Sequence, residues 1–297
     1  MADDYLSDEY FEIRIDFVPN EGDASRVFLA MGDVIEALQV LDRDLLTQFA
    51  VELESELLLE DVEKGSLKAK LRNLVKDVPD DALQNAEWKK IIGHFLLKAK
   101  YAFLHWSEEH DSIEDRSALG PLEGELLEAA KESDVLRFPA YRPISQERLL
   151  TNLRDVSNAT RRLTDRDTAS FQSSVGSARF NGNLAISDEA IRDLLTREIK
   201  ESVSNQTLLV KKPDYLGQSM WSFRYQTHAI DAKILDTEWL DSFHAQRVSL
   251  QPGDALRVTL REVFYYGHYG EVVSAHYEVL KVIDVISIPT NGQEGLF

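Results

Sequence analysis

The 297-residue sequence contains no cysteine, and its basic side chains are few for its length. Without cysteine the chain cannot form disulfides, iron–sulfur clusters, thiolate zinc sites or a thiol nucleophile. The 33 lysines and arginines face 52 acidic side chains, which gives a formal net charge of −19. Proteins that hold nucleic acid by its phosphates need excess positive charge, as do proteins on anionic membranes. The composition therefore disfavours both kinds of partner for the whole chain.

Long apolar runs are also missing. The most apolar stretch, residues 91–106, is interrupted by four ionisable side chains, so no transmembrane helix is predicted. The first ten residues, MADDYLSDEY, are acidic and lack the apolar segment of a secretory signal. Together with the missing cysteines, these features predict a cytoplasmic protein that makes no membrane contact.

Strong catalytic motifs are absent from the sequence. There is no GxxxxGK[ST] loop, no GxGxxG after a strand and no GxSxG elbow. His105 and His110 flank two glutamates, but zinc hydrolases place their histidines four residues apart on one helix face, and these are five apart. No metal or other cofactor is therefore predicted, and an enzyme is not the favoured interpretation.

The negative charge is concentrated at the N-terminal end. Residues 1–64 hold 18 acidic and four basic side chains, which is 14 of the 19 excess negative charges. This stretch can present an acidic face to a basic protein partner, and nucleic acid is not expected to bind there. A solvated surface that aids solubility is the alternative interpretation. The later part of the chain is close to neutral.

Hydrophobic patterns predict an α+β chain. Phe11, Ile13 and Ile15 alternate with charged residues, as in a half-buried strand, and apolar residues at helical spacing follow over 25–49. A second alternating run covers 51–59, and residues 67–75 fit either a strand or a helix. The N-terminal region is thus predicted as a β-α-β-β-α sandwich with its helices on one sheet face.

Further helices are expected over 88–106, 123–132 and 146–163, which extend this first domain to residue 165. Residues 166–297 are predicted as a β-rich second domain, with a hairpin at 181–183 and a helix over 187–202. A short helix is expected at 237–243. The sheet of this second domain is predicted to be mostly antiparallel and to form a small, partly open barrel. Its expected strands are 207–212, 220–225, 228–235, 247–250, 255–266 and 272–288.

The stretch Phe264–Gly270 has the most unusual local composition. Tyrosine offers a large contact area and one polar tip, so several tyrosines in one turn are typical of a partner-binding surface. The alternative is a hairpin whose tyrosines pack across the sheet. The candidate binding residues are Tyr265, Tyr266, His268 and Tyr269.

One enzymatic pattern remains. Pro213-Asp214 is followed by Asp231-Ala232-Lys233, and this resembles the PD…(D/E)xK arrangement of metal-dependent nucleases. In such sites two carboxylates hold Mg²⁺ or Mn²⁺, and the lysine stabilises charge or helps to activate water. The alternative catalytic residues are therefore Asp214, Asp231 and Lys233. A polar strand edge with a local ion pair would give the same short pattern.

Several longer stretches carry a family resemblance. They are Tyr10–Phe17, Ser25–Phe28, Glu63–Lys68, Lys212–Gly217 with Trp221 and Phe223, and Pro252–Asp254. With these stretches the chain resembles an uncharacterised family of bacterial proteins, similar to accessory components of mobile-element or phage-defence loci. The resemblance implies an antiviral-defence setting and supplies no site residues.

These observations favour a non-enzymatic binding protein of the bacterial cytoplasm, such as a sensor, adaptor or regulatory subunit. A metal-dependent nuclease is the first alternative, and an acidic mimic of nucleic acid is the second. The sequence predicts neither the partner nor the oligomeric state.

Overall fold

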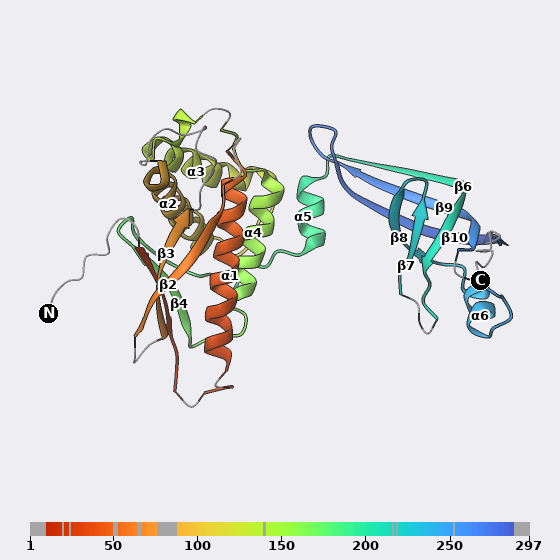
Figure 1. Cartoon of the computed structure of the whole chain (residues 1–297), viewed down its shortest axis with the longest axis horizontal. Coiled ribbons are helices and arrows are strands. Elements are labelled where there is room, and N and C mark those ends of the chain that lie inside the picture. The colour runs from red at the N-terminus through yellow and green to blue at the C-terminus, as the bar shows by residue number, and fades with distance from the viewer. Residues whose placement is uncertain are drawn as a thin grey trace, which may run out of the picture. The chain divides into compact units, whose positions relative to one another are not determined.

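The computed structural model describes residues 10–19, 21–23, 25–49, 53–63, 67–75, 88–138, 141–215, 217, 219–251 and 253–287. It confirms the predicted α+β class, with one open sheet, one closed barrel and six α-helices in the described part of the chain (Figure 1). Residues 1–9, at the start of the acidic N-terminal stretch, lie outside this part.

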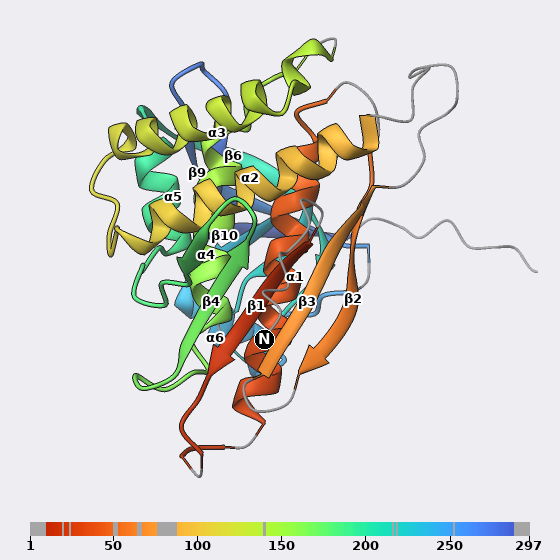
Figure 2. The same cartoon turned by 90° about the vertical axis from the view of Figure 1, so that its left-hand side faces the viewer.

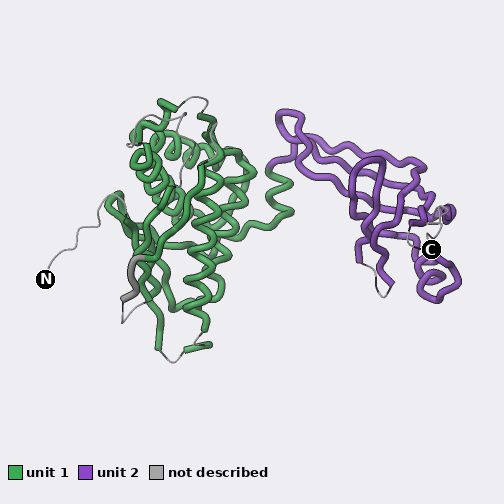
Figure 3. Tube along the Cα trace, in the orientation of Figure 1, with its two compact units in different colours: residues 1–194 green, residues 195–297 purple. Residues whose placement is uncertain are grey.

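The chain forms two compact units, residues 1–194 and 195–297 (Figure 3). The division lies further along than the predicted boundary after residue 165. The reason is that β4 (Thr168–Ser173) pairs antiparallel with β1 (Tyr10–Asp16), 150 residues earlier in the chain, and so completes the first sheet. Sequence patterns do not reveal such distant pairing, and the predicted boundary therefore fell before β4.

The first unit is a five-stranded sheet in the order β2-β3-β1-β4-β5, with antiparallel neighbours. Its first four strands have the split βαβ arrangement. Figure 2 shows the helices behind the sheet, and buried Phe11, Ile13 and Ile15 of β1 provide the apolar side of the sheet. The remaining elements are α1 (Arg26–Leu46), β2 (Ser55–Glu63), β3 (Leu67–Val75), α2 (Trp88–Glu108), α3 (Gly120–Glu132), α4 (Gln146–Ala159), β5 (Ser177–Arg179) and α5 (Asp188–Leu195).

Two local predictions in this unit are wrong. The hairpin lies between β4 and β5, around residues 174–176, and not at 181–183. Asn181 instead donates through Nδ2 to the carbonyls of Ser107 and His110 at the end of α2, at 3.0 and 2.9 Å. The helix expected over 187–202 ends at Leu195, because the following residues pair with a distant strand.

The second unit is a closed barrel in the order β10-β8-β7-β6-β9. The predicted run 247–250 forms no strand. The elements are β6 (Glu198–Lys212), β7 (Trp221–Tyr225), β8 (His228–Ile234), α6 (Thr237–His244), β9 (Ala255–Tyr266) and β10 (Val272–Ile286). Figure 1 shows β6, β9 and β10 running on past the ends of β7 and β8. We call this three-stranded extension the arm.

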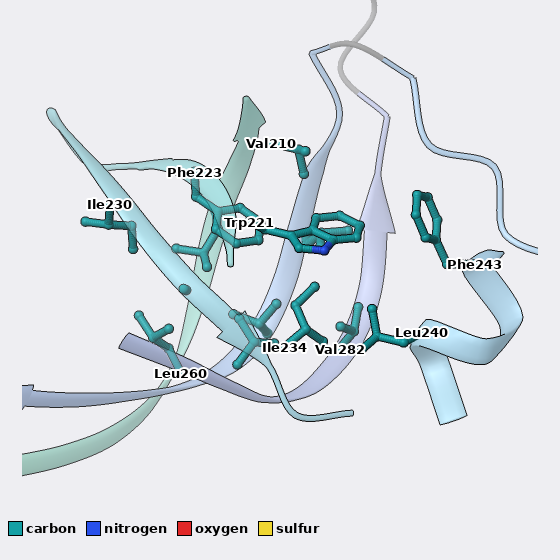
Figure 4. Packing of buried hydrophobic residues seen from close by; sticks show 14 residues of the cluster. Val210, Trp221, Phe223, Ile230, Ile234, Leu240, Phe243, Leu260 and Val282 are labelled. Carbon is teal, nitrogen blue, oxygen red and sulfur yellow. The ribbon is translucent and has the colours of Figure 1, made fainter. Parts of the chain in front are cut away.

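The barrel has its own aromatic core (Figure 4). Trp221 is 1% exposed, and its ring lies 5.0 Å from that of Phe243 and 5.7 Å from that of Trp239, both on α6. Trp221 and Phe223 are therefore core residues, as the sequence indicated. Helix α6 covers one end of the barrel.

Candidate functional site

The tyrosine-rich stretch forms the end of the β9–β10 hairpin. Its turn is closed by hydrogen bonds from the Gly267 N–H to the Glu271 carbonyl at 2.8 Å and from the Gly270 N–H to the Gly267 carbonyl at 3.2 Å. Gly270 has a φ of +81°, which favours glycine. The Glu271 carboxylate folds back over Gly267 and accepts from the Tyr269 N–H at 2.9 Å. The structure thus shows this stretch as the end of a β-hairpin.

Strand alternation separates the candidate tyrosines. Tyr265 points to the outer face of the arm, where its ring meets that of His276 at 5.4 Å, and Tyr266 points to the inner face beside Phe264 at 6.3 Å. His268 and Tyr269 lie in the turn, and Tyr269 is 87% exposed. The four residues therefore do not form one surface.

Asp214, the first residue of the nuclease-like pattern, shapes a loop. Its carboxylate accepts from the N–H groups of Gly217 and Ser219, at 3.0 and 2.9 Å, and from the Ser219 hydroxyl at 2.6 Å. These are the contacts of a side chain that fixes a turn. They use much of the hydrogen-bonding capacity that a metal would need.

Asp231 and Lys233 are exposed on the outer side of β8, two residues apart, and Ile230, Ala232 and Ile234 face the barrel interior. The Ser222 hydroxyl of β7 donates to Asp231 at 2.5 Å. Among the described residues no group of three or more histidine or acidic side chains is arranged to hold a metal ion. The structure thus places the three residues on a loop and a strand surface.

A cleft in the barrel has a volume of about 710 Å³. It opens where β8 and β10 separate: these parallel strands pair only through Ala232–Ile234 and Tyr277–Val279. The cleft is lined by Met220, Tyr225, Gln226, His228, Ala229, Ile230, Asp231, Glu262, Phe264, Ala275, His276 and Tyr277. Clefts of this size accommodate small ligands or single side chains of a partner.

Glu262 is the central polar group of this cleft. It continues the inward-facing row of β9 after Val258 and Leu260, which are fully buried. Its carboxylate accepts a hydrogen bond at 3.5 Å from the hydroxyl of Ser202, the residue opposite it on β6. The strand pairing therefore places this carboxylate in the cleft beside Phe264 and Tyr277.

The tyrosines of the cleft respond to this environment. Burial, followed by the negative charge of Glu262, raises the pKa of both Tyr225 and Tyr277 above the usual value of 10.0. The Phe264 and Tyr277 rings meet edge to face at 6.1 Å. Both hydroxyls therefore stay protonated at neutral pH, and the lining combines three aromatic rings with the carboxylates of Glu262 and Asp231.

The sequence predictions missed Glu262, Tyr225 and Tyr277. One signal was available: in the alternating run of residues 255–266, an acid occupies a position of the apolar face. A carboxylate at an inward position is costly unless it has a partner or a use. Tyr277 lies opposite Glu262 in the β9–β10 hairpin, so the hairpin register places it there, whereas Tyr225 comes near residue 262 only through the closure of the barrel.

The acidic N-terminal stretch is partly neutralised within its own unit. Several of its carboxylates form ion pairs with basic residues that follow residue 64. These pairs are Glu12–Lys68, Glu21–Arg166, Asp33–Arg162, Asp42–Lys100 and Asp44–Arg148. The uneven charge along the sequence is therefore less uneven in space.

The molecule is thus an α+β protein whose C-terminal barrel bears a cleft lined by aromatic rings and carboxylates. In the described part of the chain, no helix is both long and apolar enough to cross a membrane. Comparison with protein-family models, curated proteins and solved structures finds no match to the chain.

Proposed function

We propose that this chain is a binding protein, a sensor or adaptor subunit that recognises its partner through the cleft of the barrel. The observation that carries the proposal is the cleft itself: about 710 Å³, with three aromatic rings and the carboxylates of Glu262 and Asp231 in its lining. Aromatic side chains dominate the energetics of recognition sites, and concave sites bury most of a bound group.

The contacts of the nuclease-like residues support the same proposal. The carboxylate of Asp214 fixes a loop, and that of Asp231 accepts from Ser222. We keep the metal-dependent nuclease as an alternative because the pattern is present in the sequence. The bacterial cytoplasm, a defence locus and the acidic-mimic interpretation remain predictions from sequence.

A cleft-filling substitution tests the proposal. In Ala275→Phe the new ring enters the cleft opposite Phe264, its cross-strand neighbour. The control, Asn205→Phe, adds the same ring at an exposed position of β6 outside the cleft. Tagged full-length chains are cross-linked in the source cells, and the captured molecules are compared quantitatively.

We expect specific partners to be lost with Ala275→Phe and retained with Asn205→Phe. Equal capture by the wild type and both variants would overturn the proposal. Amide hydrogen exchange of the barrel strands verifies that each variant is folded.

A further inference from the structure

We propose that the cleft binds an organic cation, an alkylammonium or guanidinium group, between the aromatic rings and the carboxylate of Glu262. This inference rests on the proposed function and specifies its ligand. The same chemistry occurs in a lysine or arginine side chain of a protein partner and in a free polyamine, and the experiment below separates these sources.

The charges of the lining point to a cation. Glu262 and Asp231 are its acidic members, and no lysine or arginine is found among the described residues that line the cleft. His228 and His276 are the lining side chains able to gain positive charge, and both are exposed. A phosphate or carboxylate ligand would meet two negative groups without a basic partner, so anions do not fit.

Two basic residues of the arm lie near the cleft, Lys200 opposite Phe264 on the inner face and Arg261 on the outer face, and both pair with other acids. The Lys200 ammonium lies 5.0 Å from the centre of the Tyr266 ring and 3.6 Å from the Glu198 carboxylate. Arg261 points to the outer face, where it pairs with Glu201 at 2.8 Å and Glu278 at 3.0 Å. Glu262 has no ion pair with either of these cations in the structure, so a cationic ligand is its natural counter-ion.

The aromatic rings supply the second half of the recognition. Phe264 and Tyr277 meet edge to face, Tyr277 is the cross-strand partner of Glu262, and Tyr225 lines the same cleft. Aromatic rings attract cations through the negative potential of their faces. Quaternary and methylated ammonium groups are bound by such combinations of rings and acids. A neutral apolar ligand would leave the carboxylate without a partner.

Glu262 lies between Ser202 on β6 and Tyr277 on β10, its partners in the strand pairing, so two neighbouring strands set its position on the wall of the cleft. Glu262 is therefore the residue on which the affinity for a cation depends most.

The test titrates the full-length chain at pH 8 with tetramethylammonium, butylguanidinium and spermidine, followed by ligand-observed NMR and calorimetry. Butyrate and butanol are the anionic and neutral controls. Lysine-rich and arginine-rich decapeptides form a further arm, and their glutamine-substituted versions are the matched controls. The variants are Glu262→Gln, which keeps the shape, and Glu201→Gln, which makes the same charge change on the outer face.

We expect the cations to bind and the controls not to bind. Glu262→Gln should weaken cation binding by about tenfold or more, the order expected for a charge-assisted contact, and Glu201→Gln should leave it nearly unchanged. Tight binding of the decapeptides indicates a protein partner, and preference for spermidine indicates a free polyamine.

The inference falls if no cation binds, if butanol binds as well as butylguanidinium, or if Glu262→Gln binds like the wild type. Its failure is distinguishable from failure of the proposed function. If Ala275→Phe removes the cellular partner but Glu262→Gln retains it, the cleft is the recognition site and its ligand is not a cation. If cations bind but Ala275→Phe retains every partner, the cleft is not the recognition site.

Discussion

The ammonium of Lys100 pairs with the carboxylate of Asp42 in the interior of the N-terminal unit, where the two side chains are 0% and 1% exposed. Asn73 completes the group: it accepts from Lys100 at 2.9 Å and donates to Asp42 at 2.6 Å. Burial lowers the pKa of Lys100 and raises that of Asp42, and each charge opposes the shift of the other. One buried polar network thus joins α1, β3 and α2.

Removing Lys100 should strongly destabilise this unit. Lys100→Met leaves a buried carboxylate without its counter-ion, and the free energy of unfolding is expected to fall by about 3–5 kcal/mol. Lys98→Met on the same helix removes a more exposed pair with Glu132 and should cost at most about 1 kcal/mol. Urea unfolding of the full chain measures the loss of stability in each variant. Equal losses would show that the buried pair contributes no more to stability than the exposed pair.

The ionised carboxylate of Asp167 should make the free energy of unfolding depend on pH in the acidic range. Although burial alone would raise its pKa, bonds from Arg26 at 3.0 and 3.1 Å and from the N–H groups of Thr164 and Val18 lower it to about 2, from 3.8. A lowered pKa means that the stabilisation, about 2 kcal/mol, is complete above pH 4 and is lost as the pH falls towards 2.

Urea unfolding of the wild type and of Asp167→Asn between pH 7 and pH 2 checks this. We expect the difference between the two proteins to narrow over the range from pH 4 to pH 2. Asp16→Asn, which removes an exposed pair with Arg14, is the matched control and should change stability little at any pH. A pH-independent difference for Asp167→Asn would contradict the prediction.

Trp221 should determine the stability of the barrel. Trp221→Ala removes a ring packed against Phe243 and Trp239 and is expected to cost about 3–5 kcal/mol. Because the barrel has its own core, hydrogen exchange should accelerate in β7 and β8 while β1 keeps its protection. Equal acceleration in both units would show that they unfold together.

Asp214 is expected to stabilise its loop and to take no part in phosphodiester cleavage. Its carboxylate holds the backbone of Gly217 and Ser219, so Asp214→Asn is expected to loosen this loop and increase its proteolysis. With Mg²⁺ or Mn²⁺, the wild type and Asp231→Ala should both leave DNA and RNA intact. Cleavage by the wild type that is lost in Asp231→Ala would establish the nuclease alternative.

The tyrosines of the cleft should report the charge of Glu262. Burial and then the negative charge of Glu262 raise the pKa of Tyr225, so in Glu262→Gln this pKa should fall part of the way towards 10, because the charge is removed while the burial remains. Tyr141 is an internal control in the other unit: burial raises its pKa to about 12, and the variant should leave this value unchanged. Alkaline titration of ¹³C-labelled tyrosine by NMR resolves the groups, and an unmoved Tyr225 would show that Glu262 does not contact it.

Local periodicity determined much of the fold. The alternation of Phe11, Ile13 and Ile15 predicted β1, helical spacing predicted α1 and α2, and the strand over 255–266 was predicted at the bounds the structure gives. Each of these elements buries one face, and the residues of that face recur in the sequence at the spacing of a helix or a strand. The α+β class and the barrel character of the second sheet follow from them.

Pairing between distant segments decided the rest. β4 joined the first sheet through β1, and residues 198–202 became a strand because β9 offered a complete set of partners. The β9–β10 hairpin places Tyr277 opposite Glu262, and the short parallel pairing of β8 with β10 brings Tyr225 to this pair and so forms the cleft. No local pattern contains that proximity, because it depends on how the barrel closes.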